Sequence, residues 1–243
     1  MKLLILNLMM FAVCNSTLAQ NRWFETYTDS TALVKDAHAI SSLFIADIKK
    51  IRPEFRFEGK TMLDTSPALI YYGLDGNIHL PLWEQVLPQL KDFFKEITGS
   101  EAEGKRMFGL FFNGFYLPHE LGHALQEKTE GSLEPSYDSE YLANTIAVLW
   151  LRKHGYQKEL EQCYDFAKSM EDTLTDPVPQ GVDIEDFFTE NYGQAAQNPY
   201  VYGYMQFKQF VQVYEDSSLP DFDTFIAKYP KRSDRKKVWT NGV

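Results

Sequence analysis

The sequence predicts an α+β fold in one domain, with a small sheet in the N-terminal half and a mostly helical C-terminal half. Strand-like alternation is confined to residues 55–83, whereas apolar residues at helical spacing run through almost everything after Gly122. The 243 residues contain no internal repeat and no long linker rich in Pro, Gly or Ser. Because 44% of the residues are hydrophobic, we expect a globular protein with a sizeable core.

The N-terminal residues are typical of a bacterial-type secretory signal, with Lys2, an apolar run over residues 3–13, and small or polar residues after it. The run is shorter than the roughly 20 residues that a membrane-spanning helix needs. We therefore expect a cleaved signal peptide (1–19), a secreted or periplasmic domain (20–243) and no membrane span after cleavage. An uncleaved anchor helix is one alternative. A lipid anchor at Cys14 is another, which the bulky valine directly before Cys14 disfavours.

The charge balance is acidic, with a formal net charge of -10 that becomes -11 when Lys2 is removed. Such a balance argues against binding to nucleic acid or to an anionic membrane. The basic tail "KRSDRKK" is short and mixed, and we expect it to be solvated. Without Cys14 the only cysteine is Cys163, which excludes an intrachain disulfide and is best interpreted as a small buried apolar residue.

The N-terminal half is expected to hold two helices and three short strands. Apolar spacing predicts a helix from Ser30 to Ile51, with Ser30 as its cap and Pro53 ending it. The stretch "FRFEGKTML" alternates like a strand, and "ALIYYGLDGNIHLPLW" holds two more strands around a turn at residues 74–77. "WEQVLPQLKDFFKEI" is amphipathic, and Pro88 must start or kink its helix.

Four helices are predicted in the C-terminal half. They are expected at Ser139 to Leu151, Lys158 to Leu174, Asp183 to Tyr192 and Pro199 to Tyr214. Asn198 and Pro199 form a helix cap followed by a first-turn proline.

Between the two halves lies "FYLPHELGHALQEK", in which two histidines stand four residues apart. On a helix, His119 and His123 project from the same face and can present two imidazole nitrogens to one zinc ion. Glu120 is offset by one position, where it cannot easily be a ligand but can take a proton from a water that zinc has made acidic. The alternative is a helix with two solvent-facing histidines and no metal.

A catalytic zinc ion also requires a third protein ligand and one open position. Glu130 and Glu134 lie in an apparent loop, whereas Glu140 lies in the first turn of the next predicted helix. If that helix runs antiparallel to the first, Glu140 returns to the histidines; Asp138 is the alternative ligand. Small side chains at 143 and 147 would allow close packing, and Asn144 could hydrogen-bond a ligand histidine.

The motif HELGH, followed by a glutamate that opens "EYLANTIA", resembles the gluzincin metallopeptidases, and the second string resembles the ImmA/IrrE-type branch. The similarity covers residues 115–151. It implies a zincin-like fold and a zinc-dependent peptidase with His119, His123 and Glu140 as ligands and Glu120 as general base. It also implies an edge strand that pairs with an extended substrate; "NIHLPLW" could be that strand or an ordinary buried one.

Two features depart from the family pattern. Pro118 stands directly before the first histidine, so the helix either starts late or is kinked there, and "MFGLFFNGFYL" could be a separate helix or strand. Secretion is the second departure, because the ImmA/IrrE branch is associated with intracellular regulation.

Tyr202, with Gln206 one turn later, is a candidate donor to the oxyanion that forms during hydrolysis. His38 and His154 are expected at the surface or its boundary.

The function expected from these residues is a secreted zinc metallohydrolase, a peptidase acting on a peptide or protein substrate. One alternative is a catalytically inactive zincin-fold scaffold or binding protein of the cell envelope. Another is a metal-free helical binding domain. The sequence indicates neither the cleavage specificity nor the oligomeric state.

Overall fold

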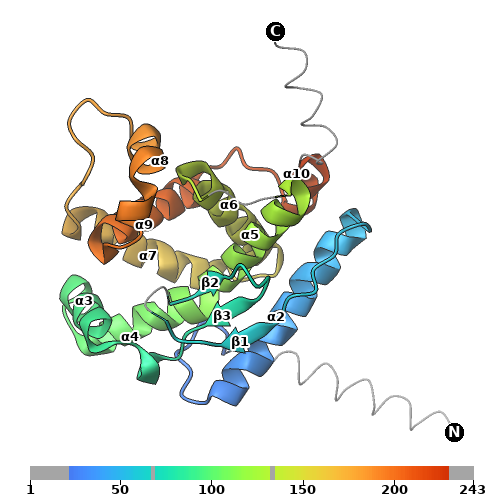
Figure 1. Ribbon diagram of the computed structural model, residues 1–243, viewed down its shortest axis with the longest axis horizontal. Coiled ribbons are helices and arrows are strands. Elements are labelled where there is room, and N and C mark those ends of the chain that lie inside the picture. Colours follow the sequence, from blue (N-terminus) through green and yellow to red (C-terminus); the bar gives the residue numbers. More distant parts are fainter. Residues whose placement is uncertain (1–21, 67–68, 132–134, 230–243) are drawn as a thin grey trace, which may run out of the picture.

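The computed structural model describes residues 22–66, 69–131 and 135–229. In these residues a three-stranded sheet lies beside a larger assembly of helices (Figure 1), so the predicted α+β class is confirmed. The predicted signal segment with Cys14, Glu134 and the basic tail fall outside the described residues. Over the described ranges, none of the helices has the length and apolar character that crossing a membrane requires.

The first described helix is α2 (Ser30–Ile51), with the predicted bounds. Its cap is Asp29 and not Ser30, because the Asp29 carboxylate accepts a 2.9 Å hydrogen bond from the Thr31 main-chain N–H. The helix ends at Ile51 with Arg52 as its C-cap, and the next residue, Pro53, cannot continue the hydrogen-bond ladder. The buried Arg52 guanidinium donates to the Ile226 carbonyl at 2.9 Å, and so ties this end of α2 to the C-terminal helix.

The sheet consists of β1 (Thr61–Leu63), β2 (Tyr71–Tyr72) and β3 (Ile78–Leu80), in the order β1-β3-β2. β3 pairs with β1 in parallel and with β2 in antiparallel fashion. Of the two alternatives for "NIHLPLW", the structure shows the ordinary buried strand, because β3 has a neighbour on both sides and its three residues are buried. Only the last three residues of "FRFEGKTML" form a strand, β1, and the two outer strands of the sheet are β1 and β2.

The central region runs through η1 (Trp83–Gln85), α3 (Pro88–Thr98), α4 (Glu101–Leu110), the π-helical η2 (Phe111–Phe115) and α5 (Tyr116–Glu130). Pro88 is the first residue of α3, so it starts this helix. The run "MFGLFFNGFYL" is neither a strand nor a separate helix. It forms the end of α4, the π turn and the start of α5, which follow one another directly.

The π turn accommodates Pro118. Proline has no N–H, so the carbonyl of Gly114, four residues earlier, lacks its usual helical donor. The indole N–H of Trp23 fills this place with a 3.1 Å hydrogen bond to the Gly114 oxygen. Two residues before Pro118, the Tyr116 N–H bonds the carbonyl of Phe111. The separation of five residues is that of a π-helix. Helix α5 therefore begins before Pro118 without a break in the chain's helical path.

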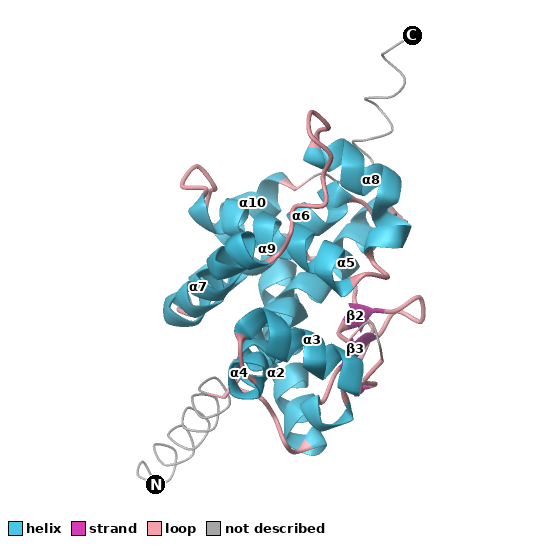
Figure 2. Cartoon of the chain, turned by 90° about the vertical axis from the view of Figure 1, so that its left-hand side faces the viewer, coloured by secondary structure: helices cyan, strands magenta, loops and turns pink. Residues whose placement is uncertain are grey.

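The C-terminal half consists of α6 (Tyr137–Lys153), α7 (Gln157–Thr173), α8 (Ile184–Ala195), α9 (Pro199–Glu215) and α10 (Phe222–Lys228). Helix α6 starts with a capping box in which Ser136 and Ser139 satisfy each other's main-chain N–H groups. Helix α10 was not predicted. Helices α5 and α6 pack along each other, and α9 packs on α6 and α7; Figure 2 shows these helices above the small sheet.

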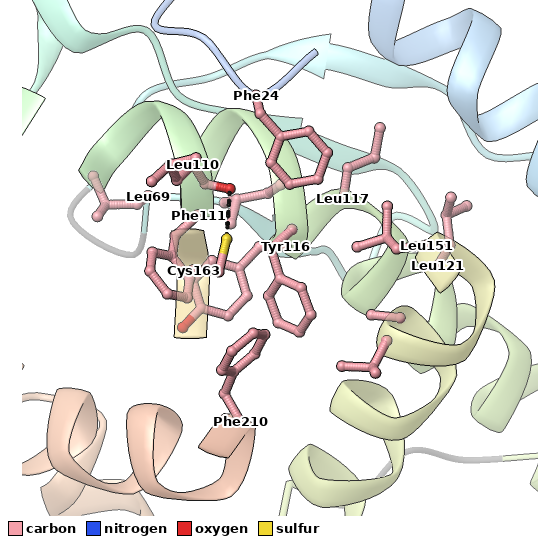
Figure 3. Packing of buried hydrophobic residues seen from close by; sticks show 14 of the residues in the cluster. Phe24, Leu69, Leu110, Phe111, Tyr116, Leu117, Leu121, Leu151, Cys163 and Phe210 are labelled. Atoms are coloured by element: carbon pink, nitrogen blue, oxygen red, sulfur yellow. Dashed lines mark hydrogen bonds between the residues drawn. The ribbon is translucent and has the colours of Figure 1, made fainter. Parts of the chain in front are cut away.

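One apolar core joins the two halves, and Figure 3 shows its part around Cys163. The Cys163 thiol is fully buried, lies 3.8 Å from the Leu110 carbonyl oxygen and has a raised pKa because of burial. Its interpretation as a small buried apolar residue is confirmed. Phe111 and Phe210, from η2 and α9, pack edge to face beside it (Figure 3), so the core holds η2, which leads directly into α5, against α9.

Candidate metal centre

Helices α5 and α6 bring His119, His123 and Glu140 together. The two histidine Nε2 atoms are 3.1 Å apart, and Glu140 Oε2 lies 3.1 Å from Nε2 of His119 and 3.5 Å from Nε2 of His123. All three side chains are buried, with exposed fractions of 2%, 6% and 4% respectively. The predicted return of Glu140 to the two histidines is therefore present in the structure.

These distances fit a shared metal ion. In a tetrahedral site with bonds of about 2.0–2.1 Å, neighbouring ligand atoms are separated by about 3.3 Å. The three separations bracket that value, so a single point can lie about 2 Å from all three atoms. Among the described residues, this is the only group of three or more His, Cys, Asp or Glu side chains with such proximity. The group can hold a metal ion, and its donor atoms do not by themselves identify which one.

The alternative ligand Asp138 is not part of the cluster. It lies in the first turn of α6 but is exposed, whereas Glu140, two residues later, is buried against α5. Glu130 is the last residue of α5, beyond the histidines.

The close packing of α5 on α6 depends on small residues, as expected from the sequence. Ala143 and Ala147 are fully buried, and Gly122 lies against Ala143. A β-carbon at Gly122 would be only 3.2 Å from the Ala143 Cα atom. Because Gly122 stands between the two histidines in sequence, this contact brings the ligand-bearing faces together.

Asn144 holds the His119 ring, again as expected. The amide oxygen of Asn144 lies 2.9 Å from Nδ1 of His119. An amide oxygen can only accept, so Nδ1 carries the proton and the lone pair of Nε2 is free to bind a metal. For His123, the Gln126 side-chain nitrogen lies 3.3 Å from Nδ1 and also donates to the Ser139 carbonyl. A donor in this place favours the His123 tautomer with its proton on Nε2, so metal binding through that atom requires the Gln126 side chain to turn or move away.

Both oxygens of Glu140 accept hydrogen bonds from side chains of the C-terminal helices. The Tyr192 hydroxyl donates to Oε1 at 2.6 Å, and the Gln206 amide donates to Oε2 at 2.7 Å. Burial by itself raises the pKa of Glu140, but the charge of His123 and the hydrogen bond to His119 outweigh it and hold that pKa well below its usual range. The carboxylate is therefore ionised, as a metal ligand must be.

Tyr192 was missed by the sequence prediction. It is one of 14 tyrosines, and nothing in its local sequence distinguishes it. It reaches Glu140 because α8 packs across the start of α6. Burial, followed by the negative charge of Glu140, raises the pKa of Tyr192 and keeps its hydroxyl a donor.

Tyr202 lies beside the site without bonding to its three central residues. Its hydroxyl accepts from the Gln206 amide at 2.9 Å and lies 3.4 Å from the Tyr192 hydroxyl. Burial raises the pKa of Tyr202 well above the usual value. The structure thus places the predicted oxyanion donor within the polar network, one contact away from Glu140.

Glu120 stands apart from the three clustered residues. Its Oε2 atom accepts a 2.8 Å hydrogen bond from the Tyr72 main-chain N–H on the edge strand β2. Tyr72 pairs with Ile78 of β3, but the Ile78 N–H bonds the Lys60 carbonyl on the opposite side of β3. Tyr72 and Ile78 are therefore a pair without direct hydrogen bonds, and the Tyr72 N–H points away from β3. Glu120 is 8% exposed, and burial raises its pKa. A buried carboxylate therefore lies between the histidines and the free edge of the sheet.

The remaining histidines do not join this cluster. His38 is exposed, as expected, and His154 is partly buried with Nε2 2.6 Å from an Asp47 oxygen. His79 is buried in β3, where its two ring nitrogens face Asp64 and Asp75.

Comparison with known proteins adds no family to this description. No protein-family model matches the chain, and no curated protein or solved structure matches it either.

Proposed function

We propose that this chain is a zinc-dependent metallohydrolase with a zincin-like fold, and that its substrates are peptides or proteins. The observation that carries the proposal is the division of roles within "HELGH". His119 and His123 converge with Glu140, whereas Glu120 points to the sheet edge and stays out of the ligand group. A glutamate in this place is available to move protons.

A zinc ion held by His119, His123 and Glu140 would supply Lewis acidity, lowering the pKa of a water at its open position and polarising a substrate carbonyl. Glu120 is the general base in this proposal. Its carboxylate accepts a proton from the attacking water and returns it to the departing amine. The raised pKa that burial gives Glu120 suits a group that both accepts and donates a proton.

The number of ligands supports a catalytic site over a purely structural one. Structural zinc sites are closed by four protein ligands, whereas catalytic sites keep a position for water or substrate. Within residues 22–66, 69–131 and 135–229, three side chains meet and no fourth His, Cys, Asp or Glu joins them.

The edge strand supports an extended peptide as substrate. The Tyr72 N–H and carbonyl on β2 face away from the sheet, and the N–H already donates to Glu120, so a peptide at this edge would bond the carbonyl or displace Glu120 from the N–H. An extended chain can add to such an edge by main-chain hydrogen bonds, without a requirement for one particular side chain. β2 replaces β3 as the strand proposed for this role.

The substitution Glu120→Gln tests the proposal. The amide keeps the size of the side chain but cannot accept the proton, so we expect zinc content to be unchanged and hydrolysis of casein or a quenched peptide library to fall by about 10²–10⁴-fold. Glu161→Gln is the matched control, because Glu161 is exposed on α7.

Three other outcomes of these measurements would contradict the proposal or favour one of its alternatives. Full activity of the Glu120→Gln variant would exclude Glu120 as the base. Wild-type protein that binds zinc but cleaves nothing in the library would favour the scaffold alternative. Wild-type protein that binds no metal would favour the metal-free binding domain.

A further inference from the structure

A chain of buried amides leads from helix α9 to His119. At its start, the Gln209 side-chain nitrogen donates to the main-chain carbonyl of Tyr137 at 2.8 Å. A main-chain carbonyl can only accept, so the nitrogen of Gln209 must face it. The Gln209 oxygen is thereby turned to the other side, toward Asn144.

The orientation of Asn144 follows from that of Gln209. The Asn144 nitrogen donates to the Gln209 oxygen at 3.1 Å and approaches the Gln206 oxygen at 3.4 Å. Its own oxygen is left facing Nδ1 of His119. Asn144 and Gln209 are both 0% exposed, so water does not compete for these groups.

Gln206 is oriented from the other side, by the Glu140 carboxylate, which can only accept. With its nitrogen facing the Oε2 atom of Glu140 at 2.7 Å, its oxygen lies toward Asn144. Two residues of α9 are thus connected to one proposed ligand each, although α9 supplies no ligand itself.

From this geometry we infer that Gln209 is a positioning residue, which acts through Asn144 to select the ring tautomer of His119 that binds metal. If the Asn144 amide turned over, its nitrogen would face Nδ1 and favour the tautomer with the proton on Nε2. That proton occupies the lone pair that a metal needs. Gln209 opposes the turn, because the reversed amide would place the Asn144 oxygen against the Gln209 oxygen, and the longer contact with the Gln206 oxygen acts in the same direction.

The inference rests on metal binding by the cluster but not on hydrolysis. Its test is therefore the zinc affinity of the purified full chain, measured by competition with a chromophoric chelator. Gln209→Met keeps an unbranched side chain of similar length and removes both polar groups. We expect zinc affinity to fall by about 10–100-fold. Gln194→Met, at an exposed position on α8, should leave the affinity at the wild-type value.

A second background separates positioning from a loss of packing. In Asn144→Asp, both carboxylate oxygens accept, so the group facing Nδ1 is an acceptor in either orientation. In this background a carboxylate oxygen also faces the Gln209 oxygen, so Gln209→Met removes a repulsion and should not lower zinc affinity. The visible spectrum of the cobalt-substituted protein should show the same pattern, with altered bands for Gln209→Met alone.

Either of two results would overturn the inference. One is an equal loss of affinity in the two backgrounds, which would indicate a general packing effect. The other is a wild-type affinity for Gln209→Met alone. Wild-type protein that binds neither zinc nor cobalt would overturn both this inference and the proposed function, whereas metal binding without hydrolysis would overturn only the function.

Discussion

Gly122 on α5 and Ala143 on α6 meet so closely that a β-carbon at Gly122 would lie 3.2 Å from the Ala143 Cα atom. The two histidines lie on α5 with Gly122, and Glu140 lies on α6 with Ala143. The distance between the two helices therefore also sets the distance of Glu140 from the histidines. The contact couples the packing of the fold to the geometry of the site.

We therefore expect Gly122→Val to separate α5 from α6 and to weaken metal binding. Overpacking at a buried contact costs about 1–3 kcal/mol of the free energy of unfolding, and the loss of zinc affinity should exceed the loss of stability in the metal-free protein. Urea denaturation of the metal-free chain and a zinc titration measure the two effects. Gly193→Ala is the control, because no atom from outside the neighbouring turns of its own helix lies within 4 Å of the added β-carbon.

Much of the candidate site was predictable because its spacing is local. Four-residue spacing on one helix placed His119 and His123 together, and the start of the next helix placed Glu140 opposite them. Asn144 followed from the same periodicity, one turn after Glu140. Its contact with His119 was therefore expected from helix geometry.

The missed residues come from segments distant in sequence. Tyr192 and Gln209 reach the site because α8 and α9 fold back across α6, a packing that no local pattern indicates. The sequence left open whether β3 is an edge strand or an inner strand for a similar reason. Strand order depends on which distant segments pair, whereas alternation along one segment shows only that a strand is present.

Trp23 and Pro118 should be energetically coupled through the Gly114 carbonyl. Trp23→Phe removes the indole donor to the buried Gly114 carbonyl, and the lost hydrogen bond should cost about 0.5–1.5 kcal/mol beyond the lost packing. In the Pro118→Ala background the new N–H can bond this carbonyl, so Trp23→Phe should cost about 1 kcal/mol less there. Chemical denaturation of the four proteins measures the difference. The lost packing is common to both backgrounds and cancels, so equal costs would contradict this account of the π turn.

Asp47 should make the stability of the fold depend on acid pH. Its buried carboxylate accepts hydrogen bonds from Lys50 at 2.8 Å, His154 at 2.6 Å and Trp150 at 3.3 Å. Burial raises the pKa of Asp47, but the hydrogen bonds from Lys50 and His154 and the charge of Lys153 outweigh burial, so the net pKa is lowered. The ionised form therefore stabilises the folded state.

Because the folded-state pKa of Asp47 is lowered, its contribution is complete above the pKa of an unfolded aspartate, about 3.9, and is lost as the pH falls through the lower folded value. We expect Asp47→Asn to lower the free energy of unfolding by about 1–3 kcal/mol at neutral pH. The difference from wild type should shrink below about pH 4. Urea denaturation across this range measures it, with the exposed Asp92→Asn as control. A difference that stays constant with pH would show that the ionised carboxylate is not the stabilising group.

The central claim is that one zinc ion binds between α5 and α6, and the most direct measurement is anomalous X-ray diffraction at the zinc absorption edge from crystals of the zinc-loaded chain. The proposed site predicts one strong peak about 2 Å from Nε2 of His119, Nε2 of His123 and the carboxylate of Glu140. A map without a peak at that point, or with its main peak on other side chains, would contradict the claim.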